Sequence, residues 1–404
     1  MCLNRLVACL GRLGSRQVAL RPLLMLMCLV VALAVPRSAQ AYPWMIRHAY
    51  AACATCHVDP SGAGVLTAYG AAQGDALLRT HYGAPSASGE ASRSAGFLWG
   101  AVDPPDWFLP SGSIRTLAVA SKYGSRAFAT DFIIMQADLK AAVVKGGFRA
   151  YGSVGYVSSS GSAASLSGGI VSREHWLGWA FGDDAFLLRA GRIDLPFGVR
   201  QIEHTLFVRQ STRTDLNDTQ QHGVALAYTG ELIRGEIMAI AGNYQVSPDA
   251  YRERGYSAYA EITPVYNLAF GVSSLVTHAA RDLYLRLPTT RQAHGLFGRW
   301  APLEPLALLA EADLVAQSAT SATGYATLLQ ADVEPLQGLH LIATGENMRL
   351  GGSNSGTSWS GWLGAGWFFA PHLDARFDFQ KQSLALGANH LAATALLFQF
   401  HAYL

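Results

Sequence analysis

Residues 373–380 read Leu-Asp-Ala-Arg-Phe-Asp-Phe-Gln, and this alternation decides the fold class. Apolar residues take every second position, and Asp, Arg and Gln take the positions between them. Because successive side chains of a β-strand point to opposite faces, this segment would present one apolar and one charged face. A charged face suits a wet interior and an apolar face suits lipid, which is the alternation of a strand in a transmembrane β-barrel.

The same period of two continues from Ser113 to Leu404, and the connections between the alternating segments are short and long in turn. The short ones are residues 182–184, 229–232, 263–267, 301–305, 334–338 and 370–372, and the longer ones are residues 158–168, 194–221, 245–255, 279–290 and 349–357. Outer-membrane barrels join their strands by short periplasmic turns and longer outer loops. We therefore predict an all-β transmembrane outer-membrane barrel of about 16 antiparallel strands over residues 113–404. A water-soluble sandwich or β-helix is the alternative fold.

The composition favours strands over helices as the elements that cross the membrane. Half of the residues are hydrophobic and 14% are charged, but no apolar run of about 18 residues follows residue 41. The last residues keep the alternation, with Phe398 and Phe400 on one face and Gln399 and His401 on the other. This ending resembles the C-terminal signal that the outer-membrane assembly machinery reads.

Residues 1–41 have the organisation of a signal peptide. A region with four arginines precedes the apolar run Leu23 to Val35, and Ala39-Gln40-Ala41 forms a cleavage site of the small-x-small type. Cleavage would remove five of the 30 Lys and Arg residues and none of the 28 acids, so the net charge would change from +2 to −3. A chain with this charge has no basic stripe for nucleic acid, so we expect no nucleic-acid partner. An uncleaved anchor is the alternative, but the apolar run is short for one.

Residues 53–57 read Cys-Ala-Thr-Cys-His, which is the C-x-x-C-H attachment pattern of a c-type haem. The thiols of Cys53 and Cys56 would add to the haem vinyl groups, and His57 would supply one axial nitrogen to the iron. The other three cysteines lie in the expected signal peptide, so we predict one covalent haem c. A Cys53–Cys56 disulfide and a zinc site are the alternatives, although zinc needs four ligands and no second cysteine pair exists.

The sixth iron ligand decides whether the haem transfers electrons or binds small ligands. A second His or a Met would complete an electron-transfer site. The candidates near the attachment pattern are His48, Met45 and His81, of which His48 lies nearest to it in the sequence. His48 is therefore the first candidate for the sixth ligand, and a surface histidine beside Arg47 is the alternative. An open sixth position would instead allow small-ligand or peroxide chemistry.

The predicted haem-binding segment is residues 42–82, and residues 83–112 form a linker to the barrel. The linker begins with a stretch rich in Gly, Ala, Ser and Pro, which is typical of flexible connections. A segment of this size cannot bury its own cofactor. A barrel of this predicted size has a lumen wide enough for a plug, so we expect the segment inside the barrel or at its periplasmic mouth.

The residues from Cys53 to His57, followed by Leu66-Thr67-Ala68-Tyr69-Gly70, resemble the fused outer-membrane cytochrome–porins of iron-oxidising bacteria. Members of that family carry one N-terminal haem segment in front of a sixteen-stranded barrel. The resemblance implies electron transfer between an extracellular redox partner and a periplasmic electron carrier. It also implies ferrous iron as a substrate and hence a metal-oxidising activity. A second and shorter resemblance, in Arg189-Ala190-Gly191-Arg192, is to substrate-selective porins.

We therefore expect an outer-membrane cytochrome–porin that conducts electrons through one covalent haem, rather than an enzyme that makes or breaks other bonds. Hydrocarbon about 30 Å thick separates the two compartments, and a haem held inside a barrel would shorten that distance. Two alternatives remain: a solute porin whose haem segment gates or senses, and a haem enzyme with an open iron position. The longest connection, residues 194–221, would either dock the outer partner or fold inward as a constriction loop.

Overall fold

The computed structural model describes residues 42–82, 96–157, 169–203, 205–215, 219–320, 322–351, 355–387 and 389–404. The predicted signal peptide, the first part of the linker and the connection 158–168 lie outside these ranges, as does His204. Among the described residues, no helix has the length and apolar character needed to cross a membrane.

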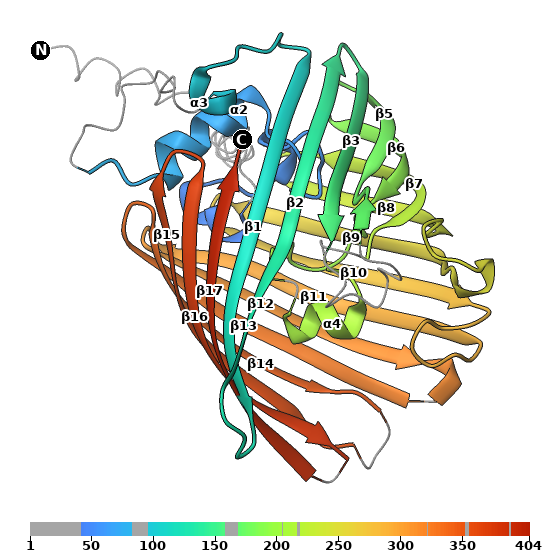
Figure 1. The fold of residues 1–404 in the computed structure, drawn as a ribbon. Helices are drawn as coiled ribbons and strands as arrows, with labels where there is room; N and C mark the ends of the chain where they lie inside the picture. The colour runs from blue at the N-terminus through green and yellow to red at the C-terminus, as the bar shows by residue number, and fades with distance from the viewer. Residues whose placement is uncertain are drawn as a thin grey trace, which may run out of the picture. The chain divides into compact units, whose positions relative to one another are not determined.

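Almost all of the remaining chain forms one antiparallel sheet (Figure 1). Its strands are β1 (Phe108–Tyr123), β2 (Ala129–Lys145), β3 (Phe148–Val157), β4 (Gly169–Val171), β5 (His175–Phe181), β6 (Phe186–Ile193), β7 (Gln221–Thr229), β8 (Ile233–Gly242), β9 (Arg254–Val265), β10 (Leu268–Ala279), β11 (Thr289–Leu303), β12 (Leu306–Gln317), β13 (Ala322–Leu336), β14 (Leu339–Arg349), β15 (Ser358–Ala370), β16 (Leu373–Leu386) and β17 (Asn389–Tyr403).

The sheet closes on itself, because β17 pairs with β1 in antiparallel register from Ser113↔Tyr403 onward. β4 and β5 both pair with β3, one after the other, and so form a single interrupted strand. The molecule is therefore a closed barrel of sixteen antiparallel strands, as the sequence predicted. A closed sheet of this kind excludes the water-soluble sandwich and the β-helix.

The two faces of the wall follow the alternation of the sequence. In β16, Asp378 is fully buried in the interior, whereas its neighbour Phe377 is 46% exposed on the outside. In β12, Asp313 and Leu314 repeat this arrangement, with the carboxylate inside and the leucine outside. A charged interior and an apolar exterior are the two faces of a transmembrane barrel, and they place the protein in the outer membrane.

The strand ends also fall where the sequence placed them, with one shift. All six predicted short connections are tight turns between consecutive strands, and we call their end of the barrel the short-turn rim. β1, however, begins at Phe108 rather than at residue 113. Residues 108–112 belong to the wall because they pair with β2, and the backbone of Leu404 bonds to Gly112. The second part of the linker therefore contributes to the barrel.

The N-terminal segment 42–82 is a chain of short helical turns. These are η1 (Pro43–His48), η2 (Cys53–Thr55), α2 (Ala68–Gln73) and η3 (Gly74–Leu78); α3 (Phe97–Gly100) precedes the barrel, α4 (Phe207–Thr212) lies in the longest connection, and η5 (Asp249–Tyr251) and η6 (Ser318–Thr320) lie in other loops. Trp44, Met45 and Ile46 of η1 pack against inward residues of the wall, among them Ala269 and Phe368. The segment therefore lies inside the barrel, at its short-turn rim.

Candidate cofactor site inside the barrel

Polar contacts fix the N-terminal segment to the inner wall along its length. Near its start, Arg47 pairs with the buried carboxylate of Asp332 on β13. Near its end, the Thr80 amide donates to the Phe368 carbonyl over 3.0 Å, close to the short-turn rim. Between them, the hydroxyl of Ser61 lies 3.5 Å from Asp194, the residue at which the longest connection leaves β6. The segment thus runs from one rim to the base of the longest outer loop.

The C-x-x-C-H pattern forms one tight turn. The amides of Cys56 and His57 both donate to the Cys53 carbonyl, over 3.1 and 3.0 Å, as η2 ends. This single turn holds the second cysteine and the histidine in fixed relation to the first cysteine. Cys56 is 2% exposed, whereas Cys53 is half-buried.

A sharp turn follows the pattern and brings the chain back. Asp59 shapes it, because its carboxylate accepts from the Ser61 amide over 2.7 Å and its carbonyl accepts from the Gly62 amide over 3.0 Å. Gly62 and Gly64 have φ of 83° and 81°, values that side chains with a Cβ seldom adopt. The returning strand pairs as an isolated bridge, His57↔Leu66.

Helix α2 closes the turn against the cysteines. The Cys56 carbonyl accepts from the Thr67 amide over 2.7 Å, and the Thr67 hydroxyl in turn caps α2 by accepting from the Gly70 amide over 3.0 Å. A Cβ at Gly70 would overlap the Cys56 carbonyl oxygen. The Leu-x-x-aromatic-Gly stretch therefore has a local structural reason: glycine lets the helix approach the attachment turn.

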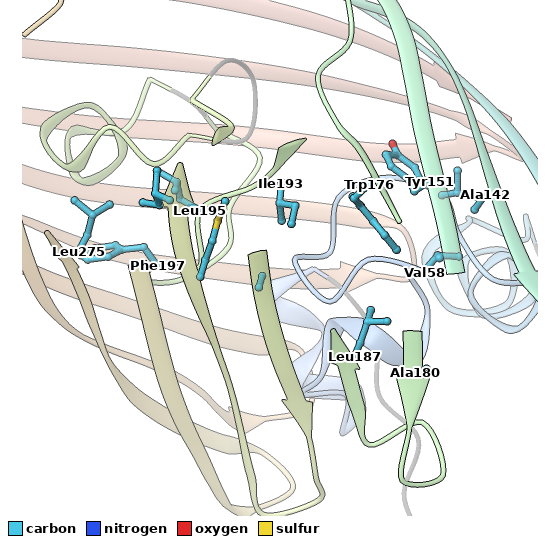
Figure 2. Packing of buried hydrophobic residues seen from close by; sticks show 14 of the residues in the cluster. Val58, Ala142, Tyr151, Trp176, Ala180, Leu187, Ile193, Leu195, Phe197 and Leu275 are labelled. Atoms are coloured by element: carbon cyan, nitrogen blue, oxygen red, sulfur yellow. The ribbon is translucent and has the colours of Figure 1, made fainter. Parts of the chain in front are cut away.

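Cys56 and His57 line a large cavity, which has a volume of about 1070 Å³. Ligand pockets are typically ~300–1,000 Å³, so this cavity can take a large cofactor. The N-terminal segment forms one side of it and the inner faces of β1, β2 and β17 form the other. Figure 2 shows the packing next to it, where Val58 lies among Tyr151, Trp176 and Leu187 of the wall.

The imidazole of His57 is held in its neutral form. Burial lowers the pKa of His57 to about 4, although the Asp59 carboxylate and a backbone hydrogen bond at Ala63 act in the opposite direction. Its Nδ1 atom is buried and has no hydrogen-bond partner within the described ranges. Neutral imidazole is the form that binds metals, so this histidine suits an axial ligand.

The three candidates for the sixth ligand lie in different surroundings. Met45 is completely buried and lines the same cavity as His57. His48 does not line it; its Nε2 lies 3.4 Å from a carboxylate oxygen of Glu334 on β13. His81 does not line it either, and its Nε2 is buried without a hydrogen-bond partner among the described residues. His48 is the candidate nearest to the C-x-x-C-H pattern in the sequence. In the structure, Met45 rather than His48 lines the cavity beside His57.

The longest connection folds inward. Leu206, Phe207 and Val208 of its helix region are buried, and the Phe207 amide donates to Glu346 of the wall over 2.6 Å. Arg209 pairs with Glu311 of β12 on the same inner surface. Of the two predictions for residues 194–221, the inward-folded constriction loop agrees with the described part of the connection, and docking of the outer partner stays a prediction.

Two cavity residues escaped the sequence analysis, Arg115 on β1 and Lys140 on β2. Their inward position follows from the period of two, but nothing in the sequence tells which inward residues face a plug. Within the described ranges, no group of three or more His, Cys, Asp or Glu residues is arranged to hold a metal ion.

A scan against protein-family models found no match, and neither did a comparison with curated protein sequences. Solved structures are similar in fold. OmpT of Vibrio cholerae matches with a TM-score of 0.55 at 11% identity over 75% of this chain and 100% of that chain. The anion-selective porin from Comamonas acidovorans matches with a TM-score of 0.55 at 10% identity, over 74% and 99%. The outer-membrane channel DcaP of Acinetobacter baumannii matches with a TM-score of 0.53 at 11% identity, over 73% and 96%. The chain thus has the barrel fold of outer-membrane porins.

Proposed function

We propose that this protein is an outer-membrane cytochrome–porin, which conducts electrons between an extracellular redox partner and the periplasm through one covalent haem c. The observation that carries the proposal is the position of the C-x-x-C-H turn. Its second cysteine and its histidine line a cavity of about 1070 Å³ that the barrel wall encloses. A plain solute porin needs neither this pattern nor a cavity beside it.

The residues at the cavity fit a c-type haem. Cys56 and His57 line the cavity, whereas the half-buried Cys53 at the start of the same turn is not among its lining residues. Cys53 and Cys56 would hold the haem by thioether bonds, and His57 would bind the iron through neutral imidazole. When bound, a haem supplies one-electron redox chemistry at its iron. The chain does the rest: one turn of backbone fixes the three groups, the hydrogen bonds of Thr67 brace that turn, and the wall keeps lipid out.

The course of the N-terminal segment supports transfer across the membrane. The segment is anchored at the short-turn rim through Thr80 and reaches Asp194, where the longest outer loop begins. A carrier in the periplasm and a donor or acceptor outside would therefore approach the same segment from opposite rims. The proposed outer partner is a soluble or mineral redox species, with ferrous iron as the example that the family resemblance supplies.

The sixth ligand is part of the proposal. Met45 and His48 are the two candidates, and we place Met45 first because it shares the cavity with His57 whereas His48 lies beside Glu334. Met ligation and a filled sixth position would both favour electron transfer over small-ligand chemistry.

The test is optical. The protein is purified from outer membranes of a host with haem-maturation machinery, and spectra of both redox states are recorded with and without carbon monoxide. We expect a covalent low-spin c-type spectrum that carbon monoxide does not change. Cys53→Ala/Cys56→Ala should lose the covalent haem, Met45→Ala should become high-spin, and His48→Ala should keep the wild-type spectrum.

The rival functions give other results. A high-spin wild-type spectrum that shifts with carbon monoxide would indicate ligand sensing or catalysis. A wild-type protein without covalent haem would contradict the proposal and leave a porin with a structural cysteine pair. Electron exchange across liposomes that enclose a redox dye separates a conduit from a haem-gated solute porin, because only the conduit reduces the dye without passing small ions.

A further inference from the structure

We propose that Arg115 and Lys140 form a carboxylate-binding wall of the cavity, and that they receive the two propionate groups of the haem. The proposal rests on the proposed function, since it assigns residues of this chain to that cofactor. It concerns a site that is separate from the attachment turn and belongs to the barrel.

Both residues lie on neighbouring strands of the inner wall. In β1, Arg115 pairs in register with Gln136 of β2, and Lys140 of β2 pairs with Ser111 of β1. Both line the cavity that Cys56 and His57 also line. A planar cofactor attached to the turn would therefore have this wall as one boundary.

Arg115 and Lys140 differ from two of the other cations of the cavity. Arg79 pairs with Asp75 over 2.6 Å, and Arg173 pairs with Asp138 over 3.1 Å. Arg200 lies 4.0 Å from Glu236, and its three guanidinium nitrogens are buried without a hydrogen-bond partner in the described ranges. Arg115 and Lys140 make no ion pair and no side-chain hydrogen bond to any residue that the structure describes. Both side chains are partly exposed to the cavity, and cations that face a cavity without a carboxylate partner leave that part of the wall open to an anionic ligand.

The carboxylates of the wall do not fill that role. One oxygen of Asp138, Oδ2, accepts from Gln136 over 2.6 Å and from Arg173 over 3.1 Å. Its other oxygen, Oδ1, has no hydrogen-bond partner in the described ranges. Glu174, the other acid that faces Lys140, makes no ion pair with it, and its Oε1 has no hydrogen-bond partner in the described ranges. His401 pairs in register with Arg115, but its Nδ1 is engaged by Asp374 over 2.8 Å and its Nε2 by Ser113 over 3.1 Å.

The two cations lie close enough for the charge of Arg115 to act on Lys140, and both act on His401. Lys140 is close enough to His57 for its charge to act on that imidazole. Arg115 acts in the same way on Tyr42, at the start of the N-terminal segment. A ligand with two carboxylates on one edge matches two cations on adjacent strands, and arginine and lysine are the residues that bind carboxylates in proteins.

The experiment measures the midpoint potential of the haem in the full-length protein as a function of pH. Arg115→Gln, Lys140→Gln and the double variant are compared with Lys122→Gln, which removes a cation from the same strand β1 but outside the cavity. We expect a lower midpoint potential in each cavity variant and the largest shift in the double variant, because loss of a nearby cation favours the ferric form. The potential should also depend more steeply on pH, because an unpaired propionate takes up a proton more readily.

Charge-conserving variants guard against a folding effect. Arg115→Lys and Lys140→Arg should keep the wild-type potential, which would support the charge as the cause. Potentials equal to that of Lys122→Gln in both neutral variants would overturn the assignment while leaving the haem itself in place. A wild-type potential that changes with inorganic phosphate at constant ionic strength, and does so only while the two cations are present, would also overturn it, because a free anion would then be the ligand. A wild-type protein without covalent haem would mean that the proposed function has failed first.

Discussion

Two segments occupy the lumen of this barrel, the N-terminal segment 42–82 and the inward loop 194–220. Both are held by arginine–carboxylate pairs buried against the wall: Asp59 of the segment pairs with Arg189, and Arg209 of the loop pairs with Glu311. The loop fills space, because its apolar side chains pack closely, with Leu195 and Phe197 in one cluster with Leu275 (Figure 2). The N-terminal segment instead supplies one side of the cavity of about 1070 Å³, to which the loop adds Arg200, Ile202 and Gln220.

This difference separates two uses of a wide barrel. A loop that packs solidly narrows the lumen and needs nothing else to be stable. A segment that borders a cavity gives up packing contacts, which costs stability unless a ligand restores them. The comparison therefore favours the N-terminal segment as the place of the proposed cofactor and the loop as the element that narrows the lumen, and four variants test that division.

The largest effect is expected for Arg189→Met. Arg189 is completely buried and pairs with both Asp59 and Glu236, so its removal leaves two carboxylates without their cation. Breaking a buried pair in this way costs about 5 kcal/mol at the upper end. The variant should release the N-terminal segment, which protease digestion of the folded protein in detergent would detect between residues 42 and 82.

The control for Arg189→Met is Arg149→Met. Arg149 pairs with Asp184 at the exposed short-turn rim, where such a pair contributes about 0–1 kcal/mol. Equal protease sensitivity of the two variants would show that Asp59 does not anchor the segment.

A smaller effect is expected for Arg209→Met, which leaves one buried carboxylate, Glu311, without its cation. The loss should be about 3 kcal/mol, and it should loosen the loop rather than the N-terminal segment. Single-channel recordings should show a larger ion conductance, and the haem spectrum should stay as in the wild type. A changed haem spectrum would mean that loosening the loop also disturbs the N-terminal segment, so that the two do not have separate roles.

Asp194 links the two segments and makes their contact depend on pH. Burial raises the pKa of Asp194 to about 6, against the opposing charge of Arg200. The pKa of Asp194 is therefore higher in the folded protein than in the unfolded protein. The protonated carboxyl stabilises the fold below pH ~4, and this contribution is lost as the pH rises through ~6. Asp194→Asn should therefore gain up to about 3 kcal/mol over the wild type at pH 7 and little at pH 4. Denaturant titrations measure the free energy of unfolding of both proteins. The same difference between Asp194→Asn and the wild type at pH 7 and at pH 4 would contradict this prediction.

The smallest effect is expected for Gly70→Ala in α2. The added Cβ would overlap the Cys56 carbonyl oxygen, and such overpacking costs about 1–3 kcal/mol. Gly74→Ala is the matched control, because a Cβ at Gly74 meets nothing within 4 Å. Haem content per protein, measured after expression at a raised temperature, should fall for Gly70→Ala and not for Gly74→Ala. Equal haem content would show that α2 does not brace the attachment turn.

The barrel was predictable because every strand repeats the same period of two. It accounts for the two faces of residues 373–380, the six short turns and the final strand. A strand with one wet and one lipid-facing surface must alternate polar and apolar residues. The start of β1 was not predictable, because residues 108–112 contain Pro110 and Gly112 and resemble irregular chain. Pairing with β2 and β17 makes them part of the wall in spite of that composition.

The site was predictable only where it is local. The turn from Cys53 to His57 and its brace by Leu66 to Gly70 depend on neighbours in the sequence, and the structure arranges them in that way. His48 lies beside Glu334, which is almost three hundred residues away in the sequence. Arg115 and Lys140 line the cavity only because their strands are the part of the wall that faces the N-terminal segment. Contacts across a lumen leave no periodic signal along a single chain.

The pairing of β17 with β1 has a consequence for the order of biogenesis. These are the last and first strands to be made, and their union surrounds a segment whose Cys56 is only 2% exposed. For the proposed haem, an enzyme that joins the cofactor to the thiols would have little access to Cys56 once the barrel is closed. Attachment in the periplasm would then precede insertion, and the outer-membrane machinery would receive a chain that already carries its cofactor.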